Sequence, residues 1–304
     1  MGTPSVMPDG AWPLLCPACS EDLLVERRAD ARVAGLSCPA GHRFDAARQG
    51  HVNLLTGRAS KFREDTPAMV ASRERWLASG GYAALGEALA AAAVRHVRPR
   101  AEPLTVVDTG SGTGWYTRRV LDGLEGAGHR ARAVDMDLSR AGAQRAARDP
   151  RVLSLVWDTW RAWPLRGACA DVLLDVFAPR NEPEFARVLS PGGVALVAVP
   201  LPGHLSELAD EAGLLGIDRH KEERLAAIFG PGWEELPPSE VHARLSLAPE
   251  DAADLAHMGP AGHHRDREEI LAGLRPGGVR SVGAHVRLHA YRRGEVIPVD
   301  HPRG

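Results

Sequence analysis

Short apolar runs alternate with longer stretches of mixed polarity from residue 104 onward, a pattern typical of buried strands separated by helices. Two late runs, near Val241–Leu247 and Val282–Tyr291, are expected to form an antiparallel strand pair. Before them, we expect parallel strands at Leu104–Val107, Arg130–Val134, Arg151–Val156, Asp171–Phe177 and, after a turn at Pro191-Gly192-Gly193, at Val194–Pro200. This order predicts a doubly wound, Rossmann-like α/β domain.

Helical periodicity precedes and separates these runs. Residues 65–98 are predicted to form two helices broken at Ser79-Gly80-Gly81, and the second, Tyr82–His96, is rich in alanine. A further helix is expected from Trp115 to about Glu125. Two more helices are expected, one after Leu205 and one around Arg219–Phe229. The chain therefore has helices enough to cover both faces of the predicted sheet.

The N-terminal segment has a different pattern, because it carries cysteines instead of long apolar runs. Two close ligand pairs, within Cys-Pro-Ala-Cys and Cys-Pro-Ala-Gly-His, flank two short strand candidates at Leu23–Glu26 and Ala31–Leu36; the candidate zinc ligands are Cys16, Cys19, Cys38 and His42. The alternative is a set of reduced, unliganded thiols. A zinc ribbon over residues 1–57 would draw folding energy from its metal, and the α/β domain would cover 58–304. Cys169, among small apolar residues, is expected to be an inert buried thiol.

A glycine-rich loop follows the first predicted strand of the α/β domain. Its sequence from residue 108 is Asp-Thr-Gly-Ser-Gly-Thr-Gly-Trp-Tyr, which predicts a strand, a tight turn and a helix start facing a nucleotide. The glycines alternate as GxGxG behind an acid, whereas a dinucleotide loop has GxGxxG. An acid suits the ammonium group of methionine, which favours S-adenosylmethionine over NAD. The alternative without a ligand is a simple glycine turn. The expected cofactor residues of the loop are Asp108, Gly110, Gly112 and Gly114.

The ends of the next strands supply further candidates. Asp137 is placed to accept hydrogen bonds from the ribose hydroxyls, and Asp135 is the alternative. The next residue, Leu138, is also expected to line the cofactor. Asp158 lies where an adenine amino group would arrive. The loop after the fourth strand, Phe-Ala-Pro-Arg-Asn from residue 177, should face the substrate, because ligands bind beyond the carboxyl ends of parallel strands.

Charge changes this picture little. The 37 Lys and Arg residues nearly balance the 39 Asp and Glu residues, so no global charge indicates nucleic acid binding. Locally, basic residues gather late in the N-terminal segment and either contact RNA phosphates or form a solvated face; they are Arg43, Arg48, Arg58, Lys61 and Arg63. No apolar run approaches the roughly 20 residues that span a membrane. We therefore expect a cytoplasmic protein without a membrane partner.

Together these strings resemble the RlmA-type 23S rRNA guanine-N1 methyltransferases over residues 16–291. The similarity lies in the cysteine pairs and in RFDAARQGHVNLL, DTGSGTGWY, DVFAPRNEPEFARVLSPGG and HMGPAGHH. The FAPRN form resembles the subgroup that confers tylosin resistance. The resemblance implies an S-adenosylmethionine-dependent enzyme with zinc bound, acting on hairpin 35 of 23S rRNA as a homodimer. Position 748 is the favoured guanine and 745 the alternative.

The expected reaction sets requirements that the sequence meets only in part. N1 of guanine lies on the Watson–Crick edge, so the base must leave its stack and be held by apolar faces, for which Phe177 and Trp115 are candidates. Phe177 is also expected to line the cofactor. Asp175 is the candidate proton acceptor, and Arg180 or Asn181 would orient the base. Two positions depart from the family pattern, His51 in Gly-His-Val-Asn and Gly81 in Ser-Gly-Gly-Tyr. The rival functions are a small-molecule methyltransferase and a non-catalytic zinc module binding RNA or protein.

Overall fold

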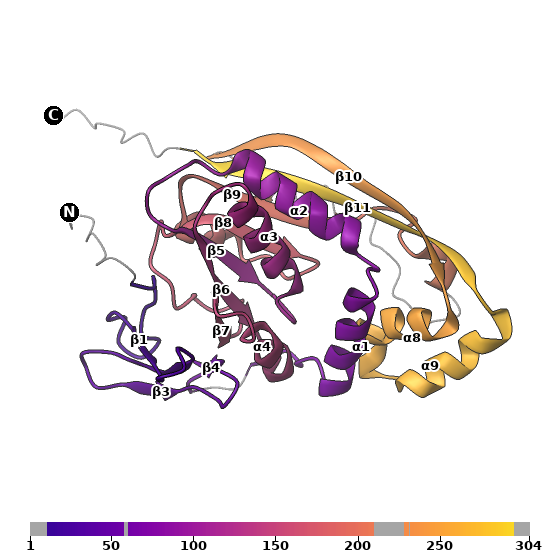
Figure 1. The fold of residues 1–304 in the computed structure, drawn as a ribbon, viewed down its shortest axis with the longest axis horizontal. Coiled ribbons are helices and arrows are strands. Elements are labelled where there is room, and N and C mark those ends of the chain that lie inside the picture. Colours follow the sequence, from indigo (N-terminus) through magenta and orange to yellow (C-terminus); the bar gives the residue numbers. More distant parts are fainter. Residues whose placement is uncertain (1–10, 58–59, 210–227, 231, 295–304) are drawn as a thin grey trace.

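The computed structural model describes residues 11–57, 60–209, 228–230 and 232–294. Near the N-terminus, three short strands form an antiparallel sheet at the lower left of Figure 1; they are β1 (Leu24–Arg27), β2 (Val33–Ser37) and β3 (Arg43–Asp45). The first two confirm the predicted strand pair, and the backbone N–H of Arg28 donates to the carbonyl of Arg32 where the chain turns.

A large mixed sheet holds the rest of the described chain together, with the strand order β10-β11-β9-β8-β5-β6-β7-β4. The strands from β9 to β4 run parallel, and β10 and β11 are antiparallel additions. This confirms the predicted doubly wound α/β domain. The strands are β4 (Val52–Asn53), β5 (Leu104–Thr109), β6 (Ala131–Asp137), β7 (Val152–Val156), β8 (Ala170–Val176), β9 (Leu189–Pro200), β10 (Trp233–Leu247) and β11 (Arg280–Arg293).

The strand order places the ligand site. The chain proceeds from β5 outward through β6 and β7, and then returns to add β8 on the other side of β5. In open parallel sheets, ligands bind outside the carboxyl ends of the strands where this order reverses. The loops after β5 and β8, which carry the glycine motif and the FAPRN motif, therefore meet at the expected site.

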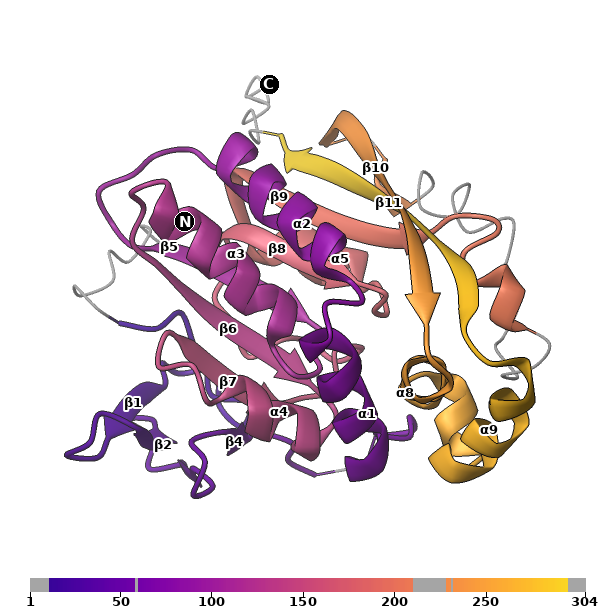
Figure 2. The ribbon, with the colours of Figure 1, turned by 45° about the vertical axis from the view of Figure 1, so that its right-hand side comes forward.

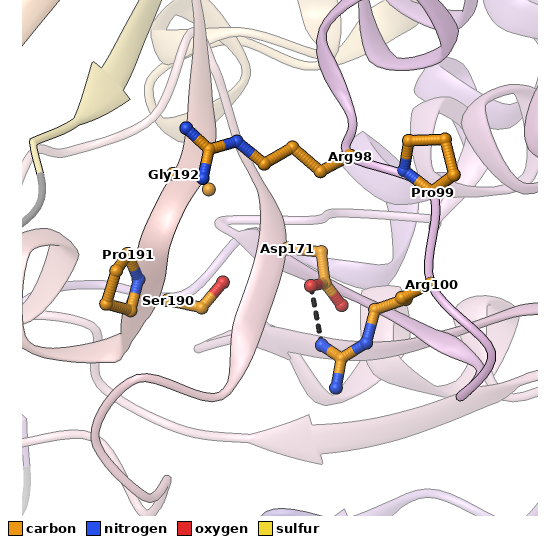
Figure 3. A pocket seen from close by; sticks show the side chains of 8 residues that line it. Arg98, Pro99, Arg100, Asp171, Ser190, Pro191 and Gly192 are labelled. Carbon is orange, nitrogen blue, oxygen red and sulfur yellow. Dashed lines mark hydrogen bonds and ion pairs between the residues drawn. The ribbon is translucent and has the colours of Figure 1, made fainter.

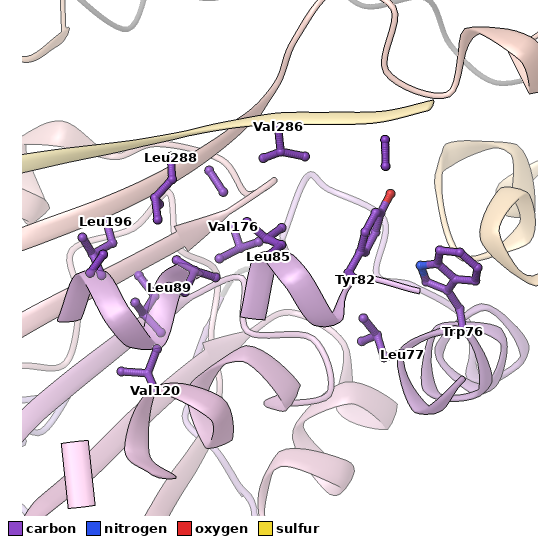
Figure 4. Close-up of a cluster of buried hydrophobic side chains, with 14 of the residues drawn as sticks. Trp76, Leu77, Tyr82, Leu85, Leu89, Val120, Val176, Leu196, Val286 and Leu288 are labelled. Atoms are coloured by element: carbon purple, nitrogen blue, oxygen red, sulfur yellow. The ribbon is translucent and has the colours of Figure 1, made fainter. Parts of the chain in front are cut away.

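Two buried layers sandwich the sheet, because alternate residues of a strand point to opposite faces. On β5, Val106 packs on the side of helices α2 (Ala83–His96) and α3 (Trp115–Gly126). Val107 packs on the opposite side, with Leu14 and Leu36 of the N-terminal segment. Figure 4 shows the first layer, with Leu89 of α2 near Val120 of α3 and Leu85 near Val176 of β8. The N-terminal segment thus shares a hydrophobic core with the α/β domain.

The helices largely follow the predicted pattern. They are α1 (Pro67–Ala78), α2 (Ala83–His96), α3 (Trp115–Gly126), α4 (Arg140–Ala146), α5 (Glu182–Val188), α8 (Pro249–His257) and α9 (Arg267–Leu274). The predicted break between the first two bends the chain by 79°. Among the described residues no single helix is both long and apolar enough to cross a membrane, although α1 and α2 pass that test as a bent pair.

Several predicted elements differ from the observed ones. The expected turn at Pro191-Gly192-Gly193 is wrong: these residues form a bulge inside β9, between the pairs Ala170–Leu189 and Val172–Val194. The Ser190 hydroxyl donates to the carbonyl of Ala170 and holds this bulge on the neighbouring strand. The helix expected after Leu205 is one 3₁₀ turn, Ser206–Leu208, and the helix expected around 219–229 lies almost wholly outside the described residues.

Several elements were not predicted, and three of them shape the fold around the site. Strand β4 extends the large sheet, since Val52 pairs with Leu155 of β7, and it ties the N-terminal segment to the α/β domain. Helices α8 and α9 connect the long strands β10 and β11 in the chain and lie beyond the end of the sheet. Both views place α8 beside α1 (Figures 1 and 2). Asp254 of α8 accepts charged hydrogen bonds from Arg75 of α1 and Arg267 of α9. These ion pairs fasten the added helices to the site-bearing part of the fold.

Candidate functional site

Three thiols and one imidazole converge beside the small sheet, and the ligand atoms of Cys16, Cys19, Cys38 and His42 all lie within 4.8 Å of one another. The sulfurs of Cys19 and Cys38 are 3.7 Å apart, and His42 Nδ1 lies 3.7 Å from Cys16 Sγ and 3.4 Å from Cys38 Sγ. Tetrahedral zinc, with bonds of about 2.3 Å to sulfur and about 2.0 Å to nitrogen, gives S···S edges of about 3.8 Å and S···N edges of about 3.5 Å. The four residues therefore fit a structural zinc ion, as predicted.

Local turns present these ligands. The N–H of Ser20 donates to the carbonyl of Cys16, and the N–H of Gly41 donates to that of Cys38. Cys16 and Cys38 are buried, while Cys19 and His42 are exposed. The ion would thus clamp two surface turns onto two core residues, which explains how a segment with so few apolar side chains can fold.

The glycine loop leaves β5 and enters α3 as predicted. Gly110, Gly112 and Gly114 have φ angles of +73°, +56° and +68°, a region that side chains with a Cβ rarely adopt. The loop is anchored to the neighbouring strand, because the N–H groups of Gly110 and Ser111 donate to the carbonyl of Met136. It is also crowded: a Cβ on Gly110 would lie 2.7 Å from Ala178 Cβ, and one on Gly112 would lie 3.1 Å from Arg73 Nη1. The backbone is therefore a cradle that a side chain would fill.

Two buried acids, Asp108 and Asp135, lie beneath this loop, and the cofactor contact of Asp108 stays a prediction. Thr117 Oγ1 is 2.6 Å from Asp108 Oδ2 and 3.0 Å from Asp135 Oδ1, and both carboxyls are buried. Burial raises the pKa of Asp108 to about 7, although the hydrogen bond from Thr117 acts to lower it. The pKa of Asp135 is raised well above its usual range by burial and by the nearby charge of Asp108. The single Thr117 proton cannot serve two carboxylates, so the geometry suits a protonated Asp135 that donates to Thr117. Asp108 then supports the loop from below.

Asp137, in contrast, lies on the open side of the loop and is half-buried. Its Oδ2 accepts from the N–H of Gly112 at 2.7 Å and its Oδ1 from the N–H of Ser139 at 2.7 Å. Because Asp135 is fully buried, Asp137 is the acid of this pair that can meet a ribose, and its neighbour Leu138 is likewise half-buried. The ribose role of Asp137 and the cofactor contact of Leu138 stay predictions.

A strap formed by residues 60–66 crosses the same edge and was not predicted. The Ser60 hydroxyl donates to Asp158 Oδ2 at 2.8 Å, beyond β7. Glu64 Oε2 accepts from the N–H of Arg140, and the carbonyl of Asp65 accepts from the Ser139 hydroxyl, beyond β6. Asp158 is buried, so its predicted contact with adenine would be made beside the strap. The strap thus joins the two loops predicted to hold the adenosine moiety.

The FAPRN loop holds its polar side chains in fixed positions. Asp175 at the end of β8 is fully buried, and its Oδ1 lies 3.5 Å from Arg180 Nε. Asn181 Nδ2 donates to the carbonyl of Thr159 at 2.9 Å. All three side chains therefore shape the loop as it stands, and their predicted roles toward a substrate stay predictions. Phe177 differs, because it is 38% exposed and has a φ of +56°, a strained conformation for a non-glycine residue.

A cavity at the opposite edge of the sheet has a volume of about 200 Å³ (Figure 3). Arg98 and Arg100 line it beside Asp171, which accepts from Arg100 Nη1 at 2.8 Å. Because Asp171 lies near the start of β8, this cavity faces the amino ends of the strands, away from the glycine loop. It is therefore distinct from the cofactor site.

Comparison with known proteins identifies the family. The model of the N-terminal domain of RlmA, a zinc ribbon, matches residues 14–59. Over 298 residues, covering 94% of this chain and 99% of the relative, the chain is 43% identical to a protein of Micromonospora griseorubida that bears the name of a 23S rRNA (guanine-N(1)-)-methyltransferase. Over 258 residues, 84% of this chain and 88% of the relative, it is 42% identical to the 23S rRNA (guanine(748)-N(1))-methyltransferase of Streptomyces fradiae. The chain belongs to the family of 23S rRNA guanine-N1 methyltransferases.

Membership of this guanine-N1 methyltransferase family confirms the resemblance seen in the sequence, and it agrees with both cofactors. The zinc ribbon carries the four metal ligands, and the strand, glycine cradle and helix start of the α/β domain fit S-adenosylmethionine. The N–H groups of the first turn of α3 receive no side-chain cap and remain available to a ligand.

The structure also shows an aromatic group around Phe177 that the sequence did not reveal. Tyr82 from the α1–α2 break and His204 from the segment after β9 lie 5.9 and 6.1 Å from Phe177, measured between ring centroids. Tyr82 Oη is 3.2 Å from His204 Nε2, and His204 Nδ1 accepts from the N–H of His285. That acceptance places the imidazole proton of neutral His204 on Nε2, facing the tyrosine. Of these three residues, only Phe177 could be recognised in the sequence, as part of the FAPRN motif. Its partners come from distant segments of the chain.

Trp115, the other aromatic candidate, has a packing role. A Cβ on Gly86 of α2 would lie 2.8 Å from its ring, and the guanidinium of Arg119 lies 4.8 Å above the ring centroid. The indole therefore fills the contact between α2 and α3. Phe177 remains the exposed aromatic candidate at the methyltransferase site.

We expect Asp137→Ala to weaken binding of S-adenosylmethionine by about 10-fold to 100-fold, since it removes charged hydrogen bonds from both the loop and the ribose. Isothermal titration calorimetry measures the change. The matched control is Asp135→Asn, which replaces a buried protonated acid with a neutral amide and should change affinity by no more than about 3-fold. Equal losses in the two variants would contradict the assignment of the ribose to Asp137.

Proposed function

We propose that this protein transfers the methyl group of S-adenosylmethionine to N1 of a guanine in hairpin 35 of 23S rRNA. Position 748 is favoured and position 745 is the alternative. The observation that carries the proposal is the 42% identity, over 84% of the chain, to the Streptomyces fradiae enzyme named for guanine 748. The glycine cradle, the FAPRN loop and the zinc ribbon are the parts of this chain that such a reaction needs.

The site supports the reaction chiefly by alignment. S-adenosylmethionine supplies an activated methyl group, and the protein must hold the guanine in line with it and exclude water. The exposed ring of Phe177 stands next to the glycine loop, since Ala178 contacts Gly110, and it can cover a base flipped from its stack. The buried pair of Asp175 and Arg180 holds the loop below that ring. For Asp175 to accept the N1 proton, the loop would have to expose it.

Exposed groups between the ribbon and the cofactor edge support an RNA substrate. Phe62 and Trp160 are 54% and 49% exposed and stack with their centroids 6.1 Å apart. Phe62 lies between Lys61 and Arg63 in the chain, and Trp160 is followed by Arg161. Exposed aromatic rings flanked by cations suit unpaired bases on a phosphate backbone. Of the other basic candidates, Arg43 pairs with Glu26 at 2.7 Å and Arg58 lies outside the described residues.

The resemblance leads us to three finer inferences. The methyl group would add bulk and remove a hydrogen-bond donor where a macrolide such as tylosin docks, and so confer resistance. The protein would act as a homodimer, and it would act in the cytoplasm, where its rRNA substrate is located. All three stay predictions.

The test is to incubate the purified, zinc-loaded protein with radiolabelled S-adenosylmethionine and 23S rRNA from a strain that lacks the modification. We expect label in the RNA and a reverse-transcription stop one nucleotide before the modified guanine, because N1 methylation blocks the Watson–Crick edge. The control is RNA already modified by the Streptomyces fradiae enzyme, which should accept no label. Label in small molecules only, or on another nitrogen, would contradict the proposal.

A further inference from the structure

One arginine from outside the α/β core reaches over the glycine loop. Arg73 of α1 places its Nη1 atom 3.1 Å from the position that a Cβ on Gly112 would take. Its Nη2 atom donates to the carbonyl of Met258 at 2.8 Å and pairs with Asp65 Oδ2 at 2.6 Å. The side chain is 25% exposed. The guanidinium is thus fixed through one nitrogen while the other points at the cradle.

The charges around the cradle are otherwise negative. Asp108 supports the loop from below, and Asp137 lines its open side. Burial raises the pKa values of Asp137 and Tyr116, whereas the positive charge of Arg73 acts to lower both. Arg73 is therefore close enough to interact electrostatically with the loop and with the first turn of α3. Carboxylates suit the ammonium, ribose and sulfonium groups of S-adenosylmethionine. They repel its carboxylate, which requires a cation.

The other arginines near the loop are engaged elsewhere. Arg118 Nη1 donates to the carbonyl of Thr113, and its charge faces Asp135 and Asp149 on the α4 side. Arg180 lies beside the buried Asp175. Among the described residues close to the loop, Arg73 is therefore the cation that stands on its ligand side.

We propose that Arg73 binds the carboxylate of the methionine moiety of S-adenosylmethionine through Nη1, with Met258 and Asp65 holding the guanidinium in place. The proposal rests on the cofactor of the proposed function. It makes Arg73 the residue that selects cofactors whose methionine moiety carries both the ammonium and the carboxylate group. It also explains two remote segments at the site. The strap contributes Asp65, and the chain after α8 contributes Met258, so both set the position of one cofactor-binding group.

The experiment compares S-adenosylmethionine with its decarboxylated form by isothermal titration calorimetry, using the zinc-loaded full chain. We expect the unmodified protein to prefer S-adenosylmethionine, and Arg73→Gln to weaken its binding by about 10-fold to 100-fold while changing affinity for the decarboxylated form by at most about 3-fold. The preference should therefore collapse. Arg73→Lys keeps the charge without the forked geometry, and it should retain part of the preference.

The matched control is Arg75→Gln on the same helix, because Arg75 pairs with Asp254 at 2.6 Å, away from the loop. It should lower the melting temperature and leave the preference between the two compounds unchanged. Equal losses for both compounds in Arg73→Gln, or an unchanged preference, would overturn the role of Arg73 and leave the proposed function standing. An unmodified protein that binds neither compound would overturn both.

Discussion

Replacing Gly112 with valine is expected to abolish binding of S-adenosylmethionine, with a loss greater than about 100-fold, while the protein stays folded. Gly112 has a φ of +56°, and a Cβ there would lie 3.1 Å from Arg73 Nη1. A β-branched residue in this conformation is strained by about 1–3 kcal/mol, and relief of the strain would move the backbone that forms the cradle. Calorimetric titration measures the affinity, and circular dichroism follows the melting transition.

Gly128, past the end of α3, is the matched control for this strain. It has a φ of +87°, and a Cβ there would meet nothing within 4 Å. Gly128→Val should therefore show a comparable fall in melting temperature with unchanged affinity for S-adenosylmethionine. If folded Gly112→Val protein bound the cofactor as the unmodified protein does, the glycine loop would not be the cofactor site.

Replacing Cys38 with serine is expected to release the zinc ion and to lower RNA methylation by more than about 100-fold, because a hydroxyl is a poor substitute for a thiolate ligand. Affinity for S-adenosylmethionine should change by no more than about 3-fold, since the glycine loop lies between β5 and α3 and carries none of the metal ligands. The melting temperature should fall as well, because Leu14 and Leu36 beside the zinc site pack in the same core as Val107 of β5. Metal analysis, RNA labelling and calorimetry separate the three effects.

Cys169→Ser is the control for this experiment, because Cys169 is a free cysteine outside the metal cluster. It should keep one zinc ion per chain and full activity. Stoichiometric zinc in Cys38→Ser protein would show that Cys38 is not a ligand, and full RNA methylation without zinc would show that the ribbon is dispensable for the substrate.

Features that depend on neighbours in the chain were predictable from the sequence. The zinc ligands lie in two short pairs whose turns orient them locally, and the alternation of Val106 and Val107 with the following glycines specifies a buried strand that enters a cofactor loop. Asp135 and Asp137 point to the same face of β6, so the alternation of faces does not separate them. The place of Asp137 at the end of the strand favours it for the ribose, and the full burial of Asp135 agrees with that choice. In each case the physical cause acts over a few residues.

Features that depend on contacts between distant segments were decided only by the tertiary structure. Arg73, Asp65 and Met258 meet at the glycine loop from three separate segments, and Tyr82 meets Phe177 and His204 in the same way. No periodicity records such pairings, because each side chain by itself is ordinary for its own helix or loop. The sequence by itself determined the metal site, the cofactor loop and the sheet that carries them. The folded chain decided which charges and rings lie beside the glycine loop and the FAPRN loop, because only long-range packing brings them together.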